Sequence, residues 1–359
     1  KTFTAIITTY YRPTLLKQAV EALQRQTHEN LEIILVNNGA TRDTVEYLHQ
    51  AASLDSRIKL IHFSENQFSW DDPMMMNDVC LNAALQASTG DYIWHQQDDD
   101  FISDDYAQKM IALFQENQEC TTAAGYPLSI DLDTNLMDDG PRVTNFRPRH
   151  MNGKELVLKL VRGDRSLFGA PGSIFTVRRD ALIKAGGYHR HIEDSHLFGI
   201  VPFGVTGFDE TAYLYWRRHS GQLNRQMSTR GQVGTKEAFS LLREWDIKDR
   251  WKLFGPAIAQ EITDHLYQRN CSHAASWSVR LLYSGHLIGA SRVFVETWRH
   301  NKYWTSIPRN LLEVKWLIFA VRDAGRLCIK ELCKGLFNLW PGIAGLSPKL
   351  EKLRERVSR

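Results

Sequence analysis

Short apolar runs alternate with longer segments of helical periodicity in the first third of the chain. Four runs rich in β-branched and aromatic residues have the character of strands, at residues 3–8, 31–36, 58–63 and 91–95. Between them, apolar residues recur every three or four positions in three segments, at residues 13–26, 41–53 and 74–88. This alternation predicts a parallel sheet covered by crossover helices, and hence an α/β fold.

The pattern changes beyond this region. Strand character weakens from about Cys120, although residues 172–178 and 212–217 still have it. From about Gly234 onward the chain has the pattern of helices. We therefore expect an α/β domain over residues 1–230 and a mostly helical C-terminal region over residues 231–359.

The composition is that of an ordinary globular protein. The 359 residues are 43% hydrophobic and 24% charged. The five cysteines are odd in number and scattered, which argues against a disulfide framework or a zinc cage and favours a cytoplasmic location. No apolar run approaches the roughly 18 residues that a membrane-spanning helix needs.

Three consecutive carboxylates, Asp98, Asp99 and Asp100, directly follow the fourth predicted strand. Like charges packed together need a counter-charge, and a hard divalent cation such as Mg²⁺ or Mn²⁺ supplies one. Because Mg²⁺ characteristically binds through one or two carboxylates and substrate phosphates, the triplet also predicts a phosphate-bearing substrate. A solvated acidic turn that leads into a helix is the alternative.

An ordered series of segments resembles glycosyltransferase family 2 with its GT-A fold. Over about the first 225 residues, the segments are 6–13, Gln26-Thr27, 31–41, Asn82, 90–93, the acidic triplet, 169–173, Arg178-Arg179, 186–188, Glu193-Asp194 and 215–219. The resemblance implies a Rossmann-like domain with a nucleotide-binding half at about 1–118 and an acceptor half at about 119–230. It also implies the inverting transfer of a sugar from a nucleotide-diphosphate donor to an acceptor hydroxyl.

The resemblance implies roles for individual residues. The expected nucleotide and donor contacts are Thr8, Thr9, Tyr10, Arg12, Asn38, Asn82, Asp98, Arg217 and Arg218. The expected ligands of Mn²⁺ or Mg²⁺ are Asp99, Asp100 and His219. Two positions depart from the family's pattern. Asn37-Asn38 stands where an Asp pair is usual, so a UDP-sugar is only the first of several donors to consider. Gln97 replaces the first Asp of the D-x-D motif, which leaves Asp99 as the expected direct metal ligand.

The acidic pair Glu193-Asp194 matches the position of the family's catalytic base. Asp194 corresponds to the residue that removes the acceptor proton, and Glu193 is the second choice. A solvated acidic pair on a loop is the alternative. Three histidines, His189, His191 and His196, surround the pair, but their spacing matches no zinc-binding pattern, so we expect them near the acceptor.

The C-terminal segment is basic and amphipathic. Residues 296–359 contain thirteen Lys or Arg against six Asp or Glu. Four of them recur every fourth position, at Arg322, Arg326, Lys330 and Lys334. Such a helix can lie on an anionic membrane surface, here the inner face of the cell membrane, or it can pack on the catalytic domain with its basic face in solvent.

Two functions stay open at this point. The first is a metal-assisted inverting glycosyltransferase that acts on a glycan or a lipid-linked glycan. The second is a non-catalytic nucleotide-sugar-binding module of a larger polysaccharide-assembly protein, which would fit a chain that begins at Lys1 without an initiator Met. Neither requires a nucleic-acid partner.

Overall fold

The computed structural model describes residues 1–70, 72–132, 136–138, 148–162, 174–189, 192–219, 221–223, 255–283 and 287–297. The chain divides into two compact units. The first contains Lys1–Ser220 and Trp245–Ile262, and the second contains Gly221–Glu244 and Thr263–Arg359. The predicted boundary near residue 230 lies outside the described residues, so it stays a prediction.

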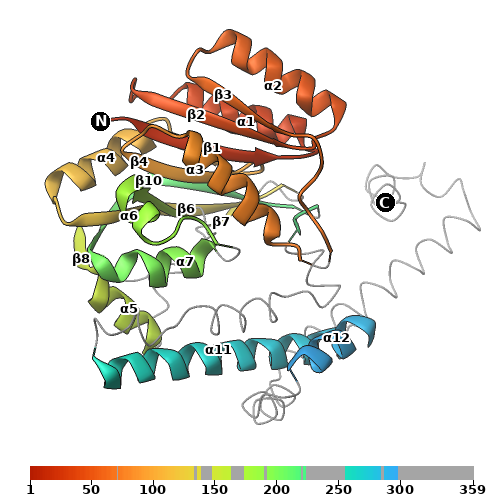
Figure 1. Ribbon diagram of the computed structural model, residues 1–359, viewed down its shortest axis with the longest axis vertical. Coiled ribbons are helices and arrows are strands. Elements are labelled where there is room, and N and C mark those ends of the chain that lie inside the picture. Colours follow the sequence, from red (N-terminus) through yellow and green to blue (C-terminus); the bar gives the residue numbers. More distant parts are fainter. Residues whose placement is uncertain are drawn as a thin grey trace, which may run out of the picture. The chain divides into compact units, whose positions relative to one another are not determined.

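The first unit is built around a ten-stranded mixed sheet (Figure 1). Its strands are β1 (Phe3–Thr9), β2 (Leu31–Asn38), β3 (Ile58–Phe63), β4 (Tyr92–Gln97), β5 (Phe101–Ile102), β6 (Cys120–Asp131), β7 (Leu136–Asp138), β8 (His150–Asn152), β9 (Phe175–Arg178) and β10 (Val205–Arg218). Across the sheet they follow the order β3-β2-β1-β4-β9-β6-β10-β5, with β7 paired to β6 and β8 paired to β10. The predicted α/β fold is thus confirmed.

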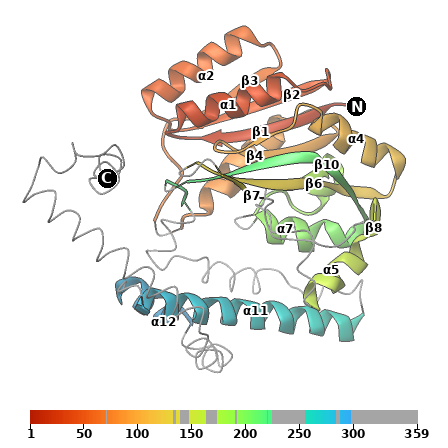
Figure 2. The ribbon, with the colours of Figure 1, turned by 180° about the vertical axis from the view of Figure 1, so that it is seen from behind.

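Helices cover both faces of this sheet (Figures 1 and 2). They are α1 (Pro13–Gln24), α2 (Arg42–Leu54), α3 (Asn82–Ala87), α4 (Tyr106–Glu116), α5 (Gly153–Val161), α6 (Arg179–Lys184) and α7 (Ile192–Gly199), with the π-turn η1 (Asn77–Leu81) and the 3-10 turn η3 (Val201–Phe203). The main core lies between one face of the sheet and α1, α2 and α4, where Leu16, Leu48 and Met110 pack over Ile7 and Trp94. The alternating direction of side chains along a strand leaves the next residue, His95, on the other face.

Four strands predicted from apolar runs are confirmed as the parallel part of the sheet. β1 lies between β2 and β4 and is parallel to both, and β2 is parallel to β3. The four-residue strand β9 then interrupts this arrangement, because it is antiparallel to β4 on one side and to β6 on the other. Beyond it, β6 and β10 are again parallel.

The strand β6 lies inside the sheet, although the sequence pattern weakens where it begins. Its residues Ala123, Ala124 and Gly125 have low strand propensity. The structure explains why they are small: a Cβ atom at Gly125 would lie 2.4 Å from the carbonyl oxygen of Ala212 and 2.7 Å from the ring of Tyr106. Because close packing at this point requires small residues, the β-branched and aromatic residues that usually indicate a strand are absent here.

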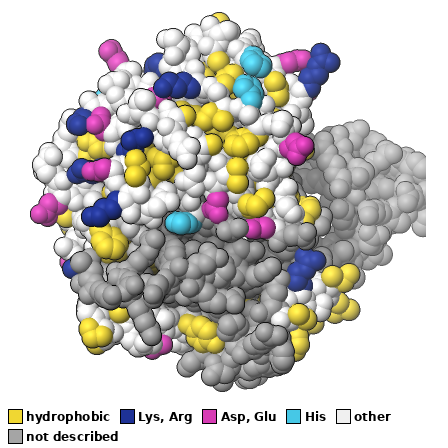
Figure 3. Space-filling view, in the orientation of Figure 1, with side chains coloured by type: hydrophobic (Ala, Val, Ile, Leu, Met, Phe, Trp, Pro, Cys, Tyr) yellow, Lys and Arg dark blue, Asp and Glu magenta, His cyan; other side chains and the backbone are white. Residues whose placement is uncertain are grey.

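In the second unit, α11 (Pro256–Tyr283) continues beyond the first unit's Ile262 and is followed by α12 (Leu287–Thr297). These two helices agree with the predicted helical C-terminal region. Leu287 and Ile288 on α12 are 65% and 81% exposed, and hydrophobic side chains appear at the surface there in Figure 3. No helix in the described parts is long and apolar enough to cross a membrane. The basic segment around Arg322–Lys334 lies outside the described residues.

Glu32 ties three segments together beneath the sheet's amino-terminal edge. Its carboxylate accepts hydrogen bonds from Thr4 Oγ1 and Lys59 Nζ, each at 2.5 Å, and from the amide and hydroxyl of Thr89 at 2.9 and 3.0 Å. Burial alone would raise the pKa of Glu32, but these donors outweigh burial and lower the pKa to about 2. Glu32 therefore stabilises the folded state in its ionised form.

We predict that Glu32→Gln lowers the free energy of unfolding by about 1–3 kcal/mol near neutral pH, because a charged acceptor is lost from a buried network. Since the pKa of Glu32 is about 2 in the folded protein against an ordinary 4.5, the contribution is complete above about pH 4.5 and is lost as the pH falls towards 2. Urea unfolding near neutral pH and near pH 3 measures this. The exposed Glu46, paired with Arg42, is the control, and Glu46→Gln is expected to cost less than about 0.5 kcal/mol. Equal losses in both variants would contradict the prediction.

Candidate active site

The residues predicted to bind the donor come from loops at one edge of the sheet. The parallel registers place Thr9 beside Asn37 and Thr8 beside Gln97, so the loops after β1, β2 and β4 begin at the same edge. β10 reaches this edge too, because it pairs with β5, the strand that directly follows the acidic triplet. Ligands of open α/β sheets bind beyond this carboxyl edge.

Arg12 lies at the centre of a charged cluster. Its Nη1 atom is 3.0 Å from Asp98 Oδ1 and 2.8 Å from Asp99 Oδ2. Thr9 donates its hydroxyl to Asp98 over 2.9 Å, and His219 Nε2 lies 3.1 Å from Asp99 Oδ2. The side chains of Asp98 and Asp99 are each only 10% exposed. This burial does not agree with a solvated acidic turn, the alternative drawn from the sequence.

The two carboxylates that face Arg12 differ in proton affinity. For Asp99, burial would raise the pKa, but the hydrogen bond with His219 and the charge of Arg12 together lower it. For Asp98, burial is the largest influence and raises the pKa to about 6 in spite of Arg12. A metal ligand must be deprotonated, so Asp99 is better suited to bind a cation than Asp98.

Asp100 and Arg217 are turned into the protein. Asp100 is 1% exposed and accepts the backbone N–H of Arg217 over 2.9 Å, and burial raises its pKa well above the ordinary value. The Arg217 guanidinium donates to the carbonyl oxygens of Asp99 and Leu15 and to the side chain of Gln18. Arg217 therefore makes internal contacts that hold the acidic loop against α1, and its contact with a donor stays a prediction.

Few of the described protein atoms at the carboxyl edge are arranged to bind a cation. Among the described side chains, no group of three or more His, Cys, Asp or Glu residues is arranged to hold a metal. Asp99 and His219 do face each other and offer one carboxylate and one imidazole. Since Mg²⁺ commonly takes one or two protein carboxylates and completes its shell with substrate phosphates and water, these residues fit a cation that arrives with a phosphorylated ligand.

Asn38 holds the next loop in place. Its side-chain amide donates to Asn66 Oδ1 over 3.0 Å and its oxygen accepts the N–H of Gln67 over 2.8 Å. Gly39 makes this contact possible, because its φ is +60° and a Cβ atom there would lie 2.4 Å from the amide nitrogen of Asn66. Asn66 was missed in the site predicted from the sequence, although its place just after the third strand was a signal for it.

Asn82, for which a donor contact stays a prediction, connects two parts of the chain. Its Nδ2 donates to the carbonyl oxygens of Asp78 and Tyr188, and its Oδ1 accepts the N–H of Tyr188, all over 2.8 Å. All three of these hydrogen bonds are internal. Asn82 thereby ties the beginning of α3 to the loop that precedes α7.

The other predicted residues are placed as follows. Tyr10 is 39% exposed and its ring meets that of Tyr11 edge-on at 5.4 Å. The hydroxyl of Thr8 is buried without a hydrogen-bond partner among the described residues. Arg218 ends β10. Glu193 and Asp194 lie in α7, where the structure describes their backbone but not their side chains. His191 lies outside the described residues.

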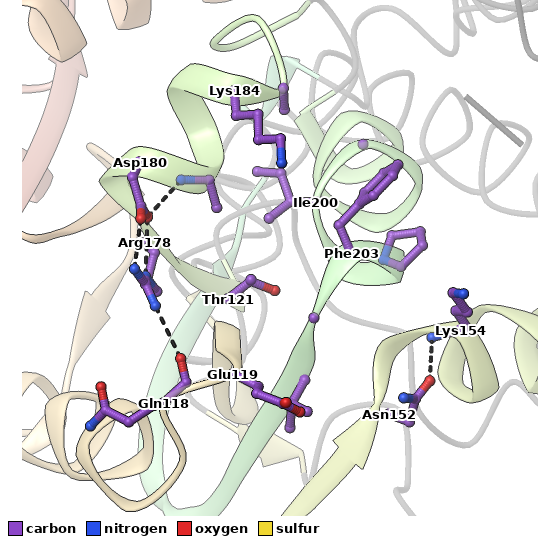
Figure 4. A pocket seen from close by; sticks show the side chains of 16 residues that line it. Gln118, Glu119, Thr121, Asn152, Lys154, Arg178, Asp180, Lys184, Ile200 and Phe203 are labelled. Carbon is purple, nitrogen blue, oxygen red and sulfur yellow. Dashed lines mark hydrogen bonds and ion pairs between the residues drawn. The ribbon is translucent and has the colours of Figure 1, made fainter. Parts of the chain in front are cut away.

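A pocket of about 1160 Å³ lies at the opposite edge of the sheet (Figure 4). Figure 4 shows Arg178 bridging Asp180 and the backbone of Gln118 on one side of it and Phe203 on the other. The pocket surrounds the amino-terminal ends of β6 and β10 and is lined by none of the predicted site residues. This pocket is therefore separate from the residues gathered at the carboxyl edge.

Comparisons with known proteins find a matching family and related sequences. The model of "Glycosyl transferase family 2" matches residues 4–186. EpsH of Bacillus subtilis, named as a glycosyltransferase, is 30% identical over 161 residues, which are 44% of this chain and 43% of that protein. An uncharacterised glycosyltransferase of Haemophilus influenzae is 28% identical over 121 residues, 34% of this chain and 35% of its own length. The chain thus matches less than half the length of either relative.

Two solved structures share the fold. The mannosyltransferase PcManGT of Pyrobaculum calidifontis, in complex with GDP-Man and Mn²⁺, aligns with a TM-score of 0.50 at 13% identity, over 94% of this chain and 87% of that one. Residues 1–349 of S. aureus TarS, in complex with UDP-GlcNAc, align with a TM-score of 0.50 at 10% identity, over 86% and 91%. At these identities the likeness is one of fold, and the fold is GT-A.

We predict that Gly39→Ala disrupts the contact between the loops after β2 and β3. The variant places a methyl group against the backbone of Asn66 in addition to adopting a positive φ, and we expect it to lose more than about 2 kcal/mol of unfolding free energy. Gly255→Ala is the matched control, because Gly255 has a φ of +80° but none of the described residues places an atom within 4 Å of the added Cβ, so only about 1 kcal/mol of backbone strain is expected. Urea unfolding compares the two, and similar losses would show that the close approach of Asn66 is unimportant.

Proposed function

The chain belongs to glycosyl transferase family 2, and on that premise we propose that it transfers a sugar from a nucleotide-diphosphate donor to a hydroxyl of a glycan or lipid-linked glycan. The observation that carries the proposal is the convergence of Arg12, Asp98, Asp99 and His219 at the carboxyl edge of the sheet. A buried cluster with cationic, anionic and imidazole groups suits a ligand that brings both a diphosphate and a metal ion.

The donor is proposed to lie across the loops after β1, β2 and β4. Asp98, whose carboxylate already accepts the Thr9 hydroxyl, is suited to hydrogen-bond a ribose or sugar hydroxyl. Asn38 and Asn66 form the base end, where neutral amides replace a carboxylate. A UDP-sugar is our first candidate, and the two fold relatives were solved with a GDP-sugar and a UDP-sugar, so both nucleotides belong in the first screen.

Asp99 and His219 are proposed to hold Mn²⁺ or Mg²⁺. When bound, the cation acts as a Lewis acid that stabilises the leaving diphosphate. Residues of this chain favour binding of the cation. Arg12 and His219 keep Asp99 ionised, and Arg217 donates a hydrogen bond to the backbone of the acidic loop. Arg12 carries a charge that is equally suited to a phosphate oxygen.

Asp194 is proposed as the general base, with Glu193 as the second choice. The acceptor hydroxyl would give its proton to the Asp194 carboxylate while its oxygen forms a bond to the anomeric carbon. The bond from that carbon to the diphosphate breaks in the same step, and its electron pair leaves with the nucleoside diphosphate. A single displacement of this kind inverts the configuration at the anomeric carbon.

The alternative is a non-catalytic nucleotide-sugar-binding module of a larger polysaccharide-assembly protein. The replacement of an Asp pair by Asn37-Asn38 and the limited coverage of the relatives favour it. Contact of the basic segment at residues 322–334 with the inner face of the cell membrane, from a cytoplasmic location, stays a further proposal.

We predict that Asp99→Ala and Asp194→Asn both remove transfer but act on different steps. Loss of the cation ligand should lower kcat by about 10²-fold or more and weaken binding of the Mn²⁺–nucleotide complex. Loss of the base should lower kcat by about 10²–10⁴-fold while nucleotide binding is retained. Steady-state kinetics and calorimetry with each variant measure this. Asp104→Asn, at an exposed carboxylate paired with Arg25, is the control. Full turnover by Asp194→Asn would remove Asp194 from the mechanism.

We predict that calorimetry with UDP, GDP and dTDP, each with and without Mn²⁺, identifies one nucleotide whose binding is strengthened by the metal. Slow hydrolysis of the matching nucleotide sugar in the same tubes would support an enzyme, because water can take the place of the acceptor. Tight binding with no hydrolysis and no transfer to any glycan would favour the non-catalytic module.

A further inference from the structure

Three buried rings connect the strand before the acidic loop to the helix that carries Glu193 and Asp194. His95 on β4 lies 6.2 Å from the ring of Tyr188, which in turn lies 5.6 Å from the ring of His196 on α7. The exposed fractions of the three residues are 3%, 2% and 1%. His95 precedes Asp98 by three residues and His196 follows Asp194 by two. The rings therefore connect, through the interior, the loop proposed to bind the donor and the helix proposed to carry the base.

The cluster contains polar atoms without hydrogen-bond partners. His95 Nδ1, the Tyr188 hydroxyl and both ring nitrogens of His196 are buried and unpaired within the described part of the chain. Such atoms destabilise a fold and are rare in proteins, whereas a phenylalanine would fill the same space without this cost. Four of them in one cluster indicate that the polar rings serve a purpose other than stability, and bridging by internal water is the usual way in which such groups are satisfied.

The backbone beside these rings is fixed from the opposite side. Asn82 binds both the N–H and the carbonyl oxygen of Tyr188. Gly187, with a φ of +84°, allows this approach, since a Cβ atom there would lie 2.4 Å from Asn82 Oδ1. The π-turn η1 directly precedes Asn82, and such turns are frequent at functional sites. Tyr188 is therefore held by its backbone and by its ring just before α7 begins.

We infer that Asn82, Tyr188 and His196 are positioning residues, which hold α7 and the base proposed on it in register with β4 and the acidic loop. The inference rests on the proposed function for its catalytic meaning. Neutral groups carry this role: burial lowers the pKa of His95 to about 4 and that of His196 to about 3, so both rings are uncharged near neutral pH. The link between β4 and α7 is then a series of contacts between uncharged rings, with Tyr188 held in addition by the hydrogen bonds of its backbone to Asn82.

The test compares His196→Phe with His196→Gln. His196→Phe keeps a ring but removes both nitrogens, so we expect an unchanged KM for the donor and a fall in kcat of about 10²-fold, the loss expected from a displacement of about 1 Å at a catalytic group. His196→Gln, which restores a donor and an acceptor, should recover most of kcat. Thr121→Val is the matched control, because it also removes a buried unpaired hydroxyl, but at the far edge of the sheet, and it should leave kcat unchanged.

Amide hydrogen exchange gives a readout that does not depend on activity. In Asn82→Ala and His196→Phe we expect faster exchange in α7 and unchanged exchange in β1 and β2. Unchanged kcat in His196→Phe, or unchanged exchange in α7 of both variants, would overturn the inference. If the unmodified protein transferred no sugar while the exchange in α7 rose in the variants, the positioning would be upheld and the proposed function would fail.

Discussion

The arrangement of the first unit depends on the neutralisation of three successive carboxylates at the end of β4. Hydrogen-bonding partners reach this segment from two distant parts of the chain: the guanidinium of Arg12 from the loop after β1, and Arg217 with His219 from the end of β10. Neutralisation of this triplet therefore requires that the parts of the chain before and after it be folded together. The short pairing of β5 with β10, immediately after the triplet, follows from the same requirement.

Around this cluster, polar residues divide into those that face a ligand and those that face the protein. Asp99 and His219 meet each other at the edge of the sheet, whereas Asp100 is almost fully buried against the backbone of Arg217. Asn82 and the ring of His196 belong to the inward group as well. The residues proposed to act on the substrate thus rest on a second layer whose hydrogen bonds fix loops and helices, a pattern common to sites that need accurate placement.

The sequence predicted the framework better than the direction of individual side chains. β1 to β4 are apolar runs, so their pattern sufficed, and the acidic triplet was placed at a strand end by position alone. The beginning of β6 was not predicted as a strand, because close packing at Gly125 requires small residues in place of β-branched ones. Spacing along the chain gives the region in which Arg217 or Asn82 lies, but not whether its side chain turns outward or inward. That choice is decided by partners such as Gln18 and Tyr188, which are far away in the sequence.

The strand β9 separates the two halves of the sheet, and it is only four residues long. It pairs with β4 through Thr176, Val177 and Arg178 and with β6 through Phe175, Thr176 and Val177, and it is antiparallel to both. Few backbone pairs therefore connect the two parts of the sheet, yet under the proposed function these parts would not divide into a donor side and an acceptor side. His219 follows β10, beyond β9, and still lies 3.1 Å from Asp99, which follows β4. A change in the strands beyond β9 would therefore also reach the proposed cation site.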